Sequence, residues 1–281
     1  MSKNLDTPVE NTWCPGCGNF GILQAVKLSF QELTDEKEWE MKDIVLASGI
    51  GCHAKIYDYV NVNGFYSIHG RVPPTITGIK LANPDLNVIG FSGDGDAYGE
   101  GISHLVHAAK RNIDVTMVIH DNRVFGLTTG QFTPTSPQGF AGKSTPGGSV
   151  EEPINPLHVM LANNASFVAR GFPGELMHLK KLLKKGIEHE GFALIDILQP
   201  CVTFYNLWDH YKDRVYNLDD EDHDVTDFSK AWEKAEEREE IPIGVFYKEE
   251  RETFNNQILE GENPSKDTRK AEVEKVIEHY K

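Results

Sequence analysis

Hydrophobic residues gather along the chain in short runs that alternate with longer amphipathic stretches. Five runs are β-branched or apolar on both faces, which is typical of strands buried in a parallel sheet. They predict strands at residues 43–48, 87–92, 115–120, 192–198 and 243–247. Apolar residues recur at helical spacing in residues 18–33, 101–111 and 174–190. This alternation predicts an α/β fold, with a mostly parallel sheet and helices on both of its faces.

Two stretches depart from this alternation. Residues 125–153 are rich in Gly, Pro, Ser and Thr and poor in aliphatic side chains. A loop of that length in a compact domain is either functional or disordered. From residue 211 onward the chain is rich in acidic residues and lysine, with one predicted strand embedded in it. We therefore expect one domain over residues 1–210 and a C-terminal extension over residues 211–281.

The charge of the chain narrows the classes of partner. Its 281 residues include 28 Lys and Arg against 43 Asp and Glu, a formal net charge of −15. Non-specific nucleic-acid binding needs a basic surface, so this class is excluded. No apolar run approaches the ~20 residues of a membrane span, and the first residues lack the pattern of a signal peptide. We expect a cytoplasmic protein that binds neither nucleic acid nor membrane.

A cluster of candidate ligands follows two of the predicted strands. Asp94 lies between Gly93 and Gly95 after one strand, and Asn122 follows the next. Ligands of open α/β sheets bind at the carboxyl ends of strands. A helix that we expect to begin near residues 98–100 would offer its N-terminus to a phosphate. Carboxylate and amide oxygens suit Mg²⁺, which takes further oxygens from phosphates. The pattern therefore predicts a diphosphate bound through a metal.

Two other interpretations of this stretch carry less weight. A GDG segment or a DN pair alone is common in turns, so only their combination indicates a function. A dinucleotide-binding fingerprint requires G-x-G-x-x-G at the start of a helix. The chain reads GDGDAYG, in which the last glycine comes one position late and Asp94 stands where bare backbone is needed.

The four cysteines form a second candidate site. Cys14 and Cys17 make a CxxC pair, while Cys52 and Cys201 each follow a predicted strand. If both strands belong to one parallel sheet, the two isolated thiols emerge near one edge, and the CxxC loop need only fold over it. Four thiolates suit zinc or an iron–sulfur cluster, and spacing does not decide between them. A thioredoxin-like pair fits poorly, and buried structural thiols are the plainer alternative for the two isolated cysteines.

The segments GDG, AAKRN and DN stand in order, with Asp94 and Asn122 28 residues apart. This arrangement resembles the thiamine diphosphate-binding signature. The resemblance implies that Asp94, Asn122 and the main-chain oxygen of Val124 hold Mg²⁺. It also implies that Gly95 and Asp96 contact the diphosphate.

A longer series of motifs points to one family. WCPGCGNFGIL at residues 13–23, GIGC, IHGR at residues 68–71, QPC and IPIGVFYKEER at residues 241–251 together resemble the β subunit of 2-oxoacid:ferredoxin oxidoreductases. In that family four cysteines bind one 4Fe–4S cluster, which implies the ligands Cys14, Cys17, Cys52 and Cys201. The residues implied to line the cofactor are Ile50, Gly51, Cys52, His53, His69, Gly93, Gly95, Asp96, Gly126 and Leu127.

The resemblance implies oxidative decarboxylation of a 2-oxoacid to an acyl-CoA and CO₂, with electrons passing through the cluster to ferredoxin. His69 and Lys55 are the candidate catalytic residues. Lys55 would pair with a substrate carboxylate or a CoA phosphate, although a solvated lysine is an equal alternative. Leu127, Thr128 and Thr129 resemble the substrate loop. Some relatives that use 2-oxoglutarate carry Lys in place of Thr129, so 2-oxoglutarate and a broad range including pyruvate both stay open.

The same resemblance implies a partner. An α subunit would supply the Glu that faces the pyrimidine ring of thiamine, in a heterodimer or a dimer of heterodimers. Residues 1–210 would bind the cofactors, and residues 211–281 would pack on that domain or on the partner. Three alternatives are a non-oxidative thiamine enzyme, a zinc-stabilised binding protein without catalysis, and an indolepyruvate or branched-chain 2-oxoacid enzyme of the same superfamily.

Overall fold

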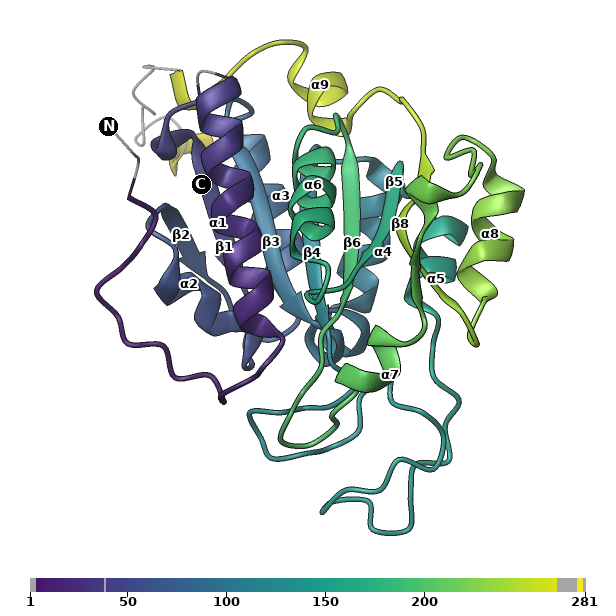
Figure 1. Ribbon diagram of the computed structural model, residues 1–281. Coiled ribbons are helices and arrows are strands. Elements are labelled where there is room, and N and C mark those ends of the chain that lie inside the picture. The colour runs from purple at the N-terminus through teal and green to yellow at the C-terminus, as the bar shows by residue number, and fades with distance from the viewer. Residues whose placement is uncertain (1–3, 38, 267–276, 280–281) are drawn as a thin grey trace.

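The computed structural model describes residues 4–37, 39–266 and 277–279. Within these residues eight strands form one sheet in the order β2-β1-β3-β4-β6-β5-β8-β7 (Figure 1). The strands are β1 (Ile44–Ser48), β2 (Asn63–Tyr66), β3 (Asn87–Gly93), β4 (Val115–Asp121), β5 (Phe167–Gly171), β6 (Phe192–Leu198), β7 (Val215–Asn217) and β8 (Ile241–Lys248). Neighbouring strands run parallel, except that β8 is antiparallel to β5. The predicted α/β class with a mostly parallel sheet is confirmed.

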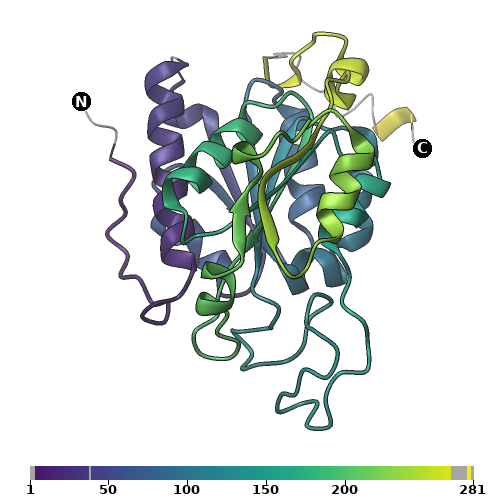
Figure 2. The same cartoon turned by 45° about the vertical axis from the view of Figure 1, so that its right-hand side comes forward.

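Helices cover both faces of the sheet. The longer ones are α1 (Asn19–Glu36), α3 (Val72–Ala82), α4 (Ile102–Arg111), α5 (Pro156–Ala162), α6 (Leu176–Ile187) and α8 (Phe228–Glu236). The shorter ones are α2 (Ile56–Tyr59), α7 (Trp208–Lys212) and α9 (Phe254–Leu259). Helices α1 and α6 lie on the face toward the viewer in Figure 1, and α3, α4 and α5 lie behind the sheet. The turned view in Figure 2 brings α8 and the outer strands forward.

The apolar core has two layers because the central strands are buried on both faces. Along β4, Met117 and Ile119 belong to the layer that contains Leu105 of α4, whereas Val118 belongs to the layer that contains Val26 of α1. Successive side chains of a strand point to opposite faces, so both faces must be apolar. This explains the unbroken apolar runs in the sequence.

The predicted strands correspond to β1, β3, β4, β6 and β8, with ends that differ by at most two residues. The three remaining strands were not predicted. The three predicted helices correspond to α1, α4 and α6, but the expected helix start near residues 98–100 was wrong. Residues Gly95–Glu100 form a π-helical turn, and α4 begins at Ile102. The turn begins at the second glycine of the GDG motif and widens the backbone there, and functional sites often carry such turns.

Residues 125–153 form a long irregular loop beyond the carboxyl ends of the central strands, at the bottom of Figures 1 and 2. Short local contacts hold it, such as the bridge between Phe125 and Gln131 and the hydrogen bond from Ile154 N to Pro134 O at 2.9 Å. No helix in the described part of the chain is long and apolar enough to cross a membrane.

The contact between α3 and β3 depends on Gly90. A Cβ atom there would lie 2.7 Å from both Met117 Sδ and Val72 Cγ1. We expect Gly90→Ala to lower the free energy of unfolding by about 1–3 kcal/mol, because overpacking a tight core forces its neighbours to move. Urea denaturation monitored by circular dichroism measures the change.

Gly78 provides the matched control, because it is exposed on α3 and a Cβ atom there would meet nothing within 4 Å. Gly78→Ala should raise the free energy of unfolding by about 0.5–1 kcal/mol through helix propensity. Equal effects of the two substitutions would contradict the packing argument.

Candidate functional site

A pocket lies at the carboxyl ends of β1, β3 and β4, where three connecting segments meet. It is lined by Ile50, Gly51, Cys52, His53, His69, Gly93, Asp94, Gly95, Asp96, Asn122, Val124, Phe125, Gly126, Leu127 and Thr128. The structure therefore brings together the residues predicted for the cofactor and for Mg²⁺. Phe125 also lines the pocket and was not predicted.

Two glycines of the GDG motif are required by the rings beside them. A Cβ atom on Gly93 would lie 2.8 Å from His53 Nδ1, and one on Gly95 would lie 2.2 Å from Phe125 Cε1. A larger residue at either position would push these rings out of the pocket. The bare main chain at Gly95 can therefore approach a ligand closely.

Asp96 lies beside the two histidines of the pocket, although His69 Nδ1 is closer to Glu100 Oε2, at 2.7 Å. Its carboxylate accepts hydrogen bonds from Ser92 Oγ at 2.6 Å and from Gly70 N, and lies 3.4 Å from His53 Nε2 and 3.5 Å from His69 Nδ1. Burial alone would raise the pKa of Asp96, but these contacts outweigh burial and lower it. Because the side chain is committed to these groups, any contact of Asp96 with a diphosphate would go through its main-chain N–H.

Asp94 is buried in surroundings that disfavour its charge. Burial and the neighbouring charge of Asp121 raise the pKa of Asp94 to about 7. Thr135 Oγ1 lies 2.7 Å from Asp94 Oδ2 and 2.8 Å from Asp121 Oδ1. One hydroxyl has one proton, so it can donate to only one of the two carboxylates at a time. A divalent cation beside Asp94 would favour its ionised form and offset its repulsion with Asp121.

Asn122 completes the candidate Mg²⁺ site. Its Oδ1 accepts from Val124 N at 3.1 Å, and its Nδ2 donates to Gln199 Oε1 at 3.0 Å, which orients the amide. The pocket thus offers a carboxylate, an amide oxygen and main-chain oxygens, the hard donors that Mg²⁺ prefers. These residues fit the metal.

The CxxC loop is tied to the segments that carry the other two cysteines. Trp13 Nε1 donates to Cys52 O at 2.6 Å, Gly18 N donates to Pro200 O at 3.2 Å, and Trp208 Nε1 donates to Gly16 O at 2.9 Å. The loop therefore folds over the carboxyl edge of the sheet.

The thiols themselves are close together. A Cβ atom on Gly126 would lie 3.5 Å from Cys52 Sγ and 3.8 Å from Cys201 Sγ. Burial, with smaller contributions from the charges of the other three cysteines, raises the pKa of Cys17 to about 11. All four cysteines are free. Four thiolates that repel one another fit a positively charged centre, and thiolates are the ligands of zinc and of iron–sulfur clusters.

The described side chains do not by themselves form a ready-made metal site of several His, Cys, Asp or Glu ligands. Across residues 4–37, 39–266 and 277–279, no group of three or more His, Cys, Asp or Glu side chains is placed so that it could hold a metal ion. The candidate Mg²⁺ site uses one such side chain, Asp94, with amide and main-chain oxygens. The thiols of Cys52 and Cys201 lie beside Gly126.

Comparisons with known proteins agree with this geometry. Residues 49–197 match the family model "Thiamine pyrophosphate enzyme, C-terminal TPP binding domain", and residues 201–262 match the model for the C-terminal part of the pyruvate ferredoxin oxidoreductase β subunit. The β subunit of 2-oxoacid:ferredoxin oxidoreductase 1 from Aeropyrum pernix is 44% identical over 92% of this chain and 84% of the relative. The chain belongs to the family of 2-oxoacid:ferredoxin oxidoreductase β subunits.

Other members show the same likeness. The β subunit of the 2-oxoacid:ferredoxin oxidoreductase from Saccharolobus solfataricus is 42% identical over 91% of this chain and 87% of the relative. A solved structure of 2-oxoglutarate:ferredoxin oxidoreductase from Magnetococcus marinus, with 2-oxoglutarate, coenzyme A and succinyl-CoA bound, superposes with a TM-score of 0.88. The two sequences are 35% identical, and the match covers 99% of this chain and 94% of that chain.

Of the residues predicted for catalysis and substrate binding in this β subunit, Lys55 and Thr129 lie outside the pocket lining. Lys55 Nζ donates to Thr12 Oγ1 at 2.8 Å, which turns the ammonium toward the CxxC segment. Thr129 is exposed in the turn between Phe125 and Gln131, with a φ of +79° that is unusual for a β-branched residue. Their roles stay predictions.

Besides Phe125, sequence reasoning missed Thr135, which contacts Asp94. It lies in the irregular loop, 41 residues after Asp94, and its hydroxyl still contacts that carboxylate. No spacing rule connects a loop threonine with a strand end, so only the folded chain reveals the contact.

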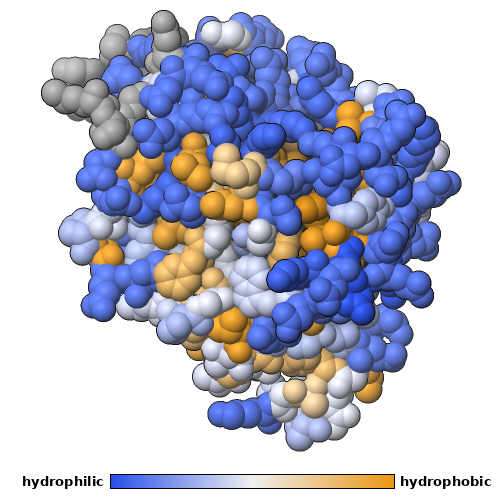
Figure 3. Space-filling view, in the orientation of Figure 1, coloured by the Kyte–Doolittle hydropathy of each residue, from blue (hydrophilic) through white to orange (hydrophobic). Residues whose placement is uncertain are grey.

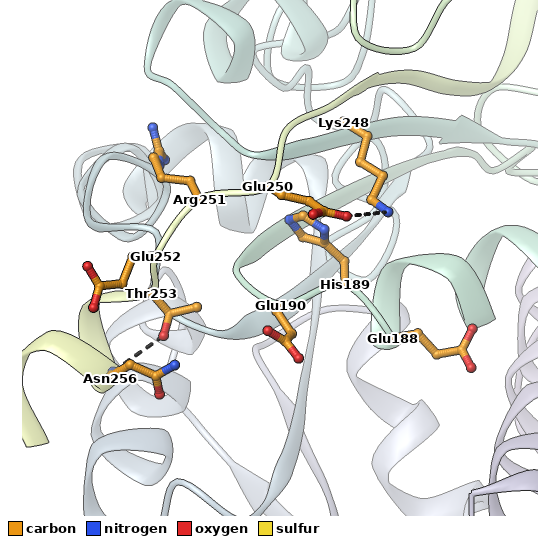
Figure 4. A pocket seen from close by; sticks show the side chains of 9 residues that line it. All are labelled: Glu188, His189, Glu190, Lys248, Glu250, Arg251, Glu252, Thr253 and Asn256. Atoms are coloured by element: carbon orange, nitrogen blue, oxygen red, sulfur yellow. Dashed lines mark hydrogen bonds and ion pairs between the residues drawn. The ribbon is translucent and has the colours of Figure 1, made fainter. Parts of the chain in front are cut away.

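A larger cavity of about 540 Å³ lies at the opposite edge of the sheet (Figure 4). Its cationic and histidine side chains already have partners. Lys248 lies 3.9 Å from Glu250, Arg251 donates to Asn164 O at 2.7 Å, and His189 Nε2 lies 2.7 Å from Ser166 Oγ. Ligands of such sheets bind at the carboxyl ends of strands, so this cavity at the amino ends is assigned no part in the chemistry.

The raised pKa of Asp94 predicts how pH acts on the metal-free β subunit. Between about pH 4 and pH 7 the folded state keeps a proton that the unfolded state has released, so stability should fall as pH rises. Asp94→Asn should reduce this fall and give a more stable metal-free protein at pH 8. Urea unfolding at pH 5 and pH 8 checks both expectations.

Addition of Mg²⁺ at pH 8 gives the second half of this test. It should stabilise the wild-type chain and not the Asp94→Asn variant, whereas the exposed Asp220→Asn control should behave as wild type. The same response of all three proteins to Mg²⁺ would show that Asp94 is not a ligand.

Proposed function

We propose that this chain binds thiamine diphosphate through Mg²⁺, binds one 4Fe–4S cluster, and acts with an α subunit. With CoA, the complex converts a 2-oxoacid to an acyl-CoA, CO₂ and a proton, and the two electrons released reduce oxidised ferredoxin. One observation carries the proposal. Cys52 lines the cofactor pocket, and its thiol lies beside that of Cys201 at Gly126, which lines the same pocket. Electron transfer from the cofactor to a cluster requires the cysteine thiols to lie close to the cofactor pocket, whereas a non-redox thiamine enzyme has no such requirement.

The residues of the chain have distinct parts in this proposal. Thiamine diphosphate supplies carbanion chemistry at the keto carbon, and an iron–sulfur cluster accepts single electrons. Asp94, Asn122 and the main-chain oxygen of Val124 hold Mg²⁺. Asp96 orients His53 at the pocket wall, and Glu100 and Asp96 together orient His69. Cys14, Cys17, Cys52 and Cys201 hold the cluster.

The surface around the pocket supports a partner subunit. The pocket has a volume of about 70 Å³, whereas sites that enclose a whole ligand usually measure ~300–1,000 Å³. Large apolar side chains are exposed on segments at this edge, including Tyr66, Ile68, Leu127 and Val150. On the face shown in Figure 3, apolar surface gathers in the middle and lower part. An α subunit that covers this edge would complete the site and supply the Glu against the pyrimidine ring, in a heterodimer or a dimer of heterodimers.

The names of the relatives support either 2-oxoglutarate or 2-oxoacids in general as substrate. The subunit KorB of 2-oxoglutarate synthase from Methanothermobacter thermautotrophicus is 38% identical over 70% of this chain and 68% of the relative, and the solved Magnetococcus structure contains 2-oxoglutarate. The relative from Aeropyrum pernix is named for 2-oxoacids in general. We therefore propose 2-oxoglutarate or a broad range that includes pyruvate.

The cluster is tested by an anaerobic visible spectrum with iron and sulfide analysis. The wild-type chain should contain about four irons and absorb broadly near ~400 nm. Both properties should be lost in Cys52→Ala and in Cys201→Ala, while Thr128→Ala, a control in the same pocket, should keep them. Zinc, or no metal, in the wild-type chain would contradict the electron-transfer proposal and favour a non-redox thiamine subunit.

Thr129 tests the choice of substrate. If its position faces the second carboxylate of 2-oxoglutarate, Thr129→Lys should raise kcat/KM for 2-oxoglutarate relative to pyruvate by about 10–100-fold, the value of a hydrogen bond to a charged group. The reaction is assayed with the α subunit present. Thr129→Gln is the uncharged control and should leave the ratio within about threefold. An unchanged ratio in the lysine variant would remove the loop from substrate selection.

A further inference from the structure

A row of buried charged residues crosses three strands behind the cofactor pocket. Arg170 of β5 is the register partner of Asp196 of β6, and Asp121 ends the neighbouring strand β4. All three point to the face of the sheet that α4 and α5 cover, because each lies two residues along its strand from an apolar residue of that layer. Arg123 lies two residues after the end of β4. Charged residues are rarely placed in such a core unless they are paired.

The two arginines of this row are not paired. Arg170 is 8% exposed, and among the described residues its guanidinium donates no hydrogen bond and has no carboxylate within 4.0 Å. The Nε atom of Arg123 is also buried and has no hydrogen-bond partner among the described residues. Each guanidinium lies over an aromatic ring, Arg170 on Phe246 at 5.5 Å and Arg123 on Tyr211 at 5.9 Å. The charges of Asp121 and Asp196 act on both arginines, but neither carboxylate is close enough to form an ion pair with them. A buried cation without an acceptor is costly, so a missing acceptor is the expected explanation.

Both arginines line one cavity of about 220 Å³ that is separate from the cofactor pocket. Its walls come from the ends of β4, β5 and β6, where Asp121 and Asp196 lie beside the two arginines, from Pro137 and Pro153 of the irregular loop, and from Glu237 and Arg238 after α8. The volume lies below that of sites for drug-sized ligands and suits a small ion. Guanidinium groups bind planar or tetrahedral oxyanions through paired N–H donors.

We propose that this cavity binds a small oxyanion, a phosphate or a short carboxylate, between Arg123 and Arg170. The contrast with the larger cavity of Figure 4 supports the assignment, since the cations there already have protein acceptors. The proposal does not depend on the identity of the cofactor in the neighbouring pocket.

The test is isothermal titration calorimetry of the full-length chain, with inorganic phosphate in one arm and malonate in the other. Saturating thiamine diphosphate and Mg²⁺ are present to occupy the cofactor pocket. We expect one saturable site for at least one of the two anions, and the arm that binds identifies the source of the oxyanion. Arg170→Met should weaken this binding at least tenfold. Arg251→Met, the same substitution in the cavity of Figure 4, should leave it unchanged.

Two outcomes would overturn the proposal. One is the absence of saturable binding of either anion, which would mean that water fills the cavity. The other is binding that Arg170→Met leaves unchanged, which is also what phosphate bound in the cofactor pocket would give. If Arg170→Met does not fold, Arg170→Lys keeps the charge but loses the planar pair of donors, and it should weaken binding by about three- to tenfold. Crystals soaked in selenate should then show anomalous density between Arg123 and Arg170, and its absence there would count against the site.

Discussion

The parallel strands β1, β3 and β4 end at nearly the same level of the sheet, and the positions of the functional groups depend on this alignment. Ser48 of β1 is the register partner of Phe91 of β3, and Gly93 of β3 is the partner of His120 of β4. The segments that follow these strands therefore leave the sheet side by side. A shift of one residue in the pairing of a strand would turn its side chains to the opposite face of the sheet. Asp94 or Asn122 would then leave the strand end on the wrong face. The buried apolar side chains on both faces prevent such a slip.

The same physics decides what the sequence could reveal. Strands β3, β4 and β6 are buried on both faces, so their apolar runs are legible, and GDG with its distant Asn marks the edge where they end. Strand β2 is exposed along its whole length, β7 has three residues, and β5 contains Arg170, so none of them carries that signal. The antiparallel direction of β8 depends on its partner β5 and not on its own composition.

The functional site, like the fold, was predictable only in part from the sequence. Residues that follow strands were predictable, because the carboxyl edge of a parallel sheet gathers them. Phe125 and Thr135 lie in the irregular loop, where periodicity gives no information. The π-helical turn after Asp94 was also invisible, because its composition resembles that of an ordinary helix start. Sequence motifs thus identify the groups at the edge, and the fold adds the loop residues that surround them.

The links between the CxxC loop and the segment after β6 also bear on the order in which the chain can assemble. Trp208 and Pro200 hold the loop from a part of the chain that leaves the ribosome long after Cys14 and Cys17. Domains begin to fold from the N-terminus during synthesis. The two early thiols, however, gain their native neighbours only when β6 has joined the sheet and Cys201 has arrived. Maturation of the thiol site is therefore a late step in the biogenesis of this protein, and truncated chains that end before residue 201 should lack it.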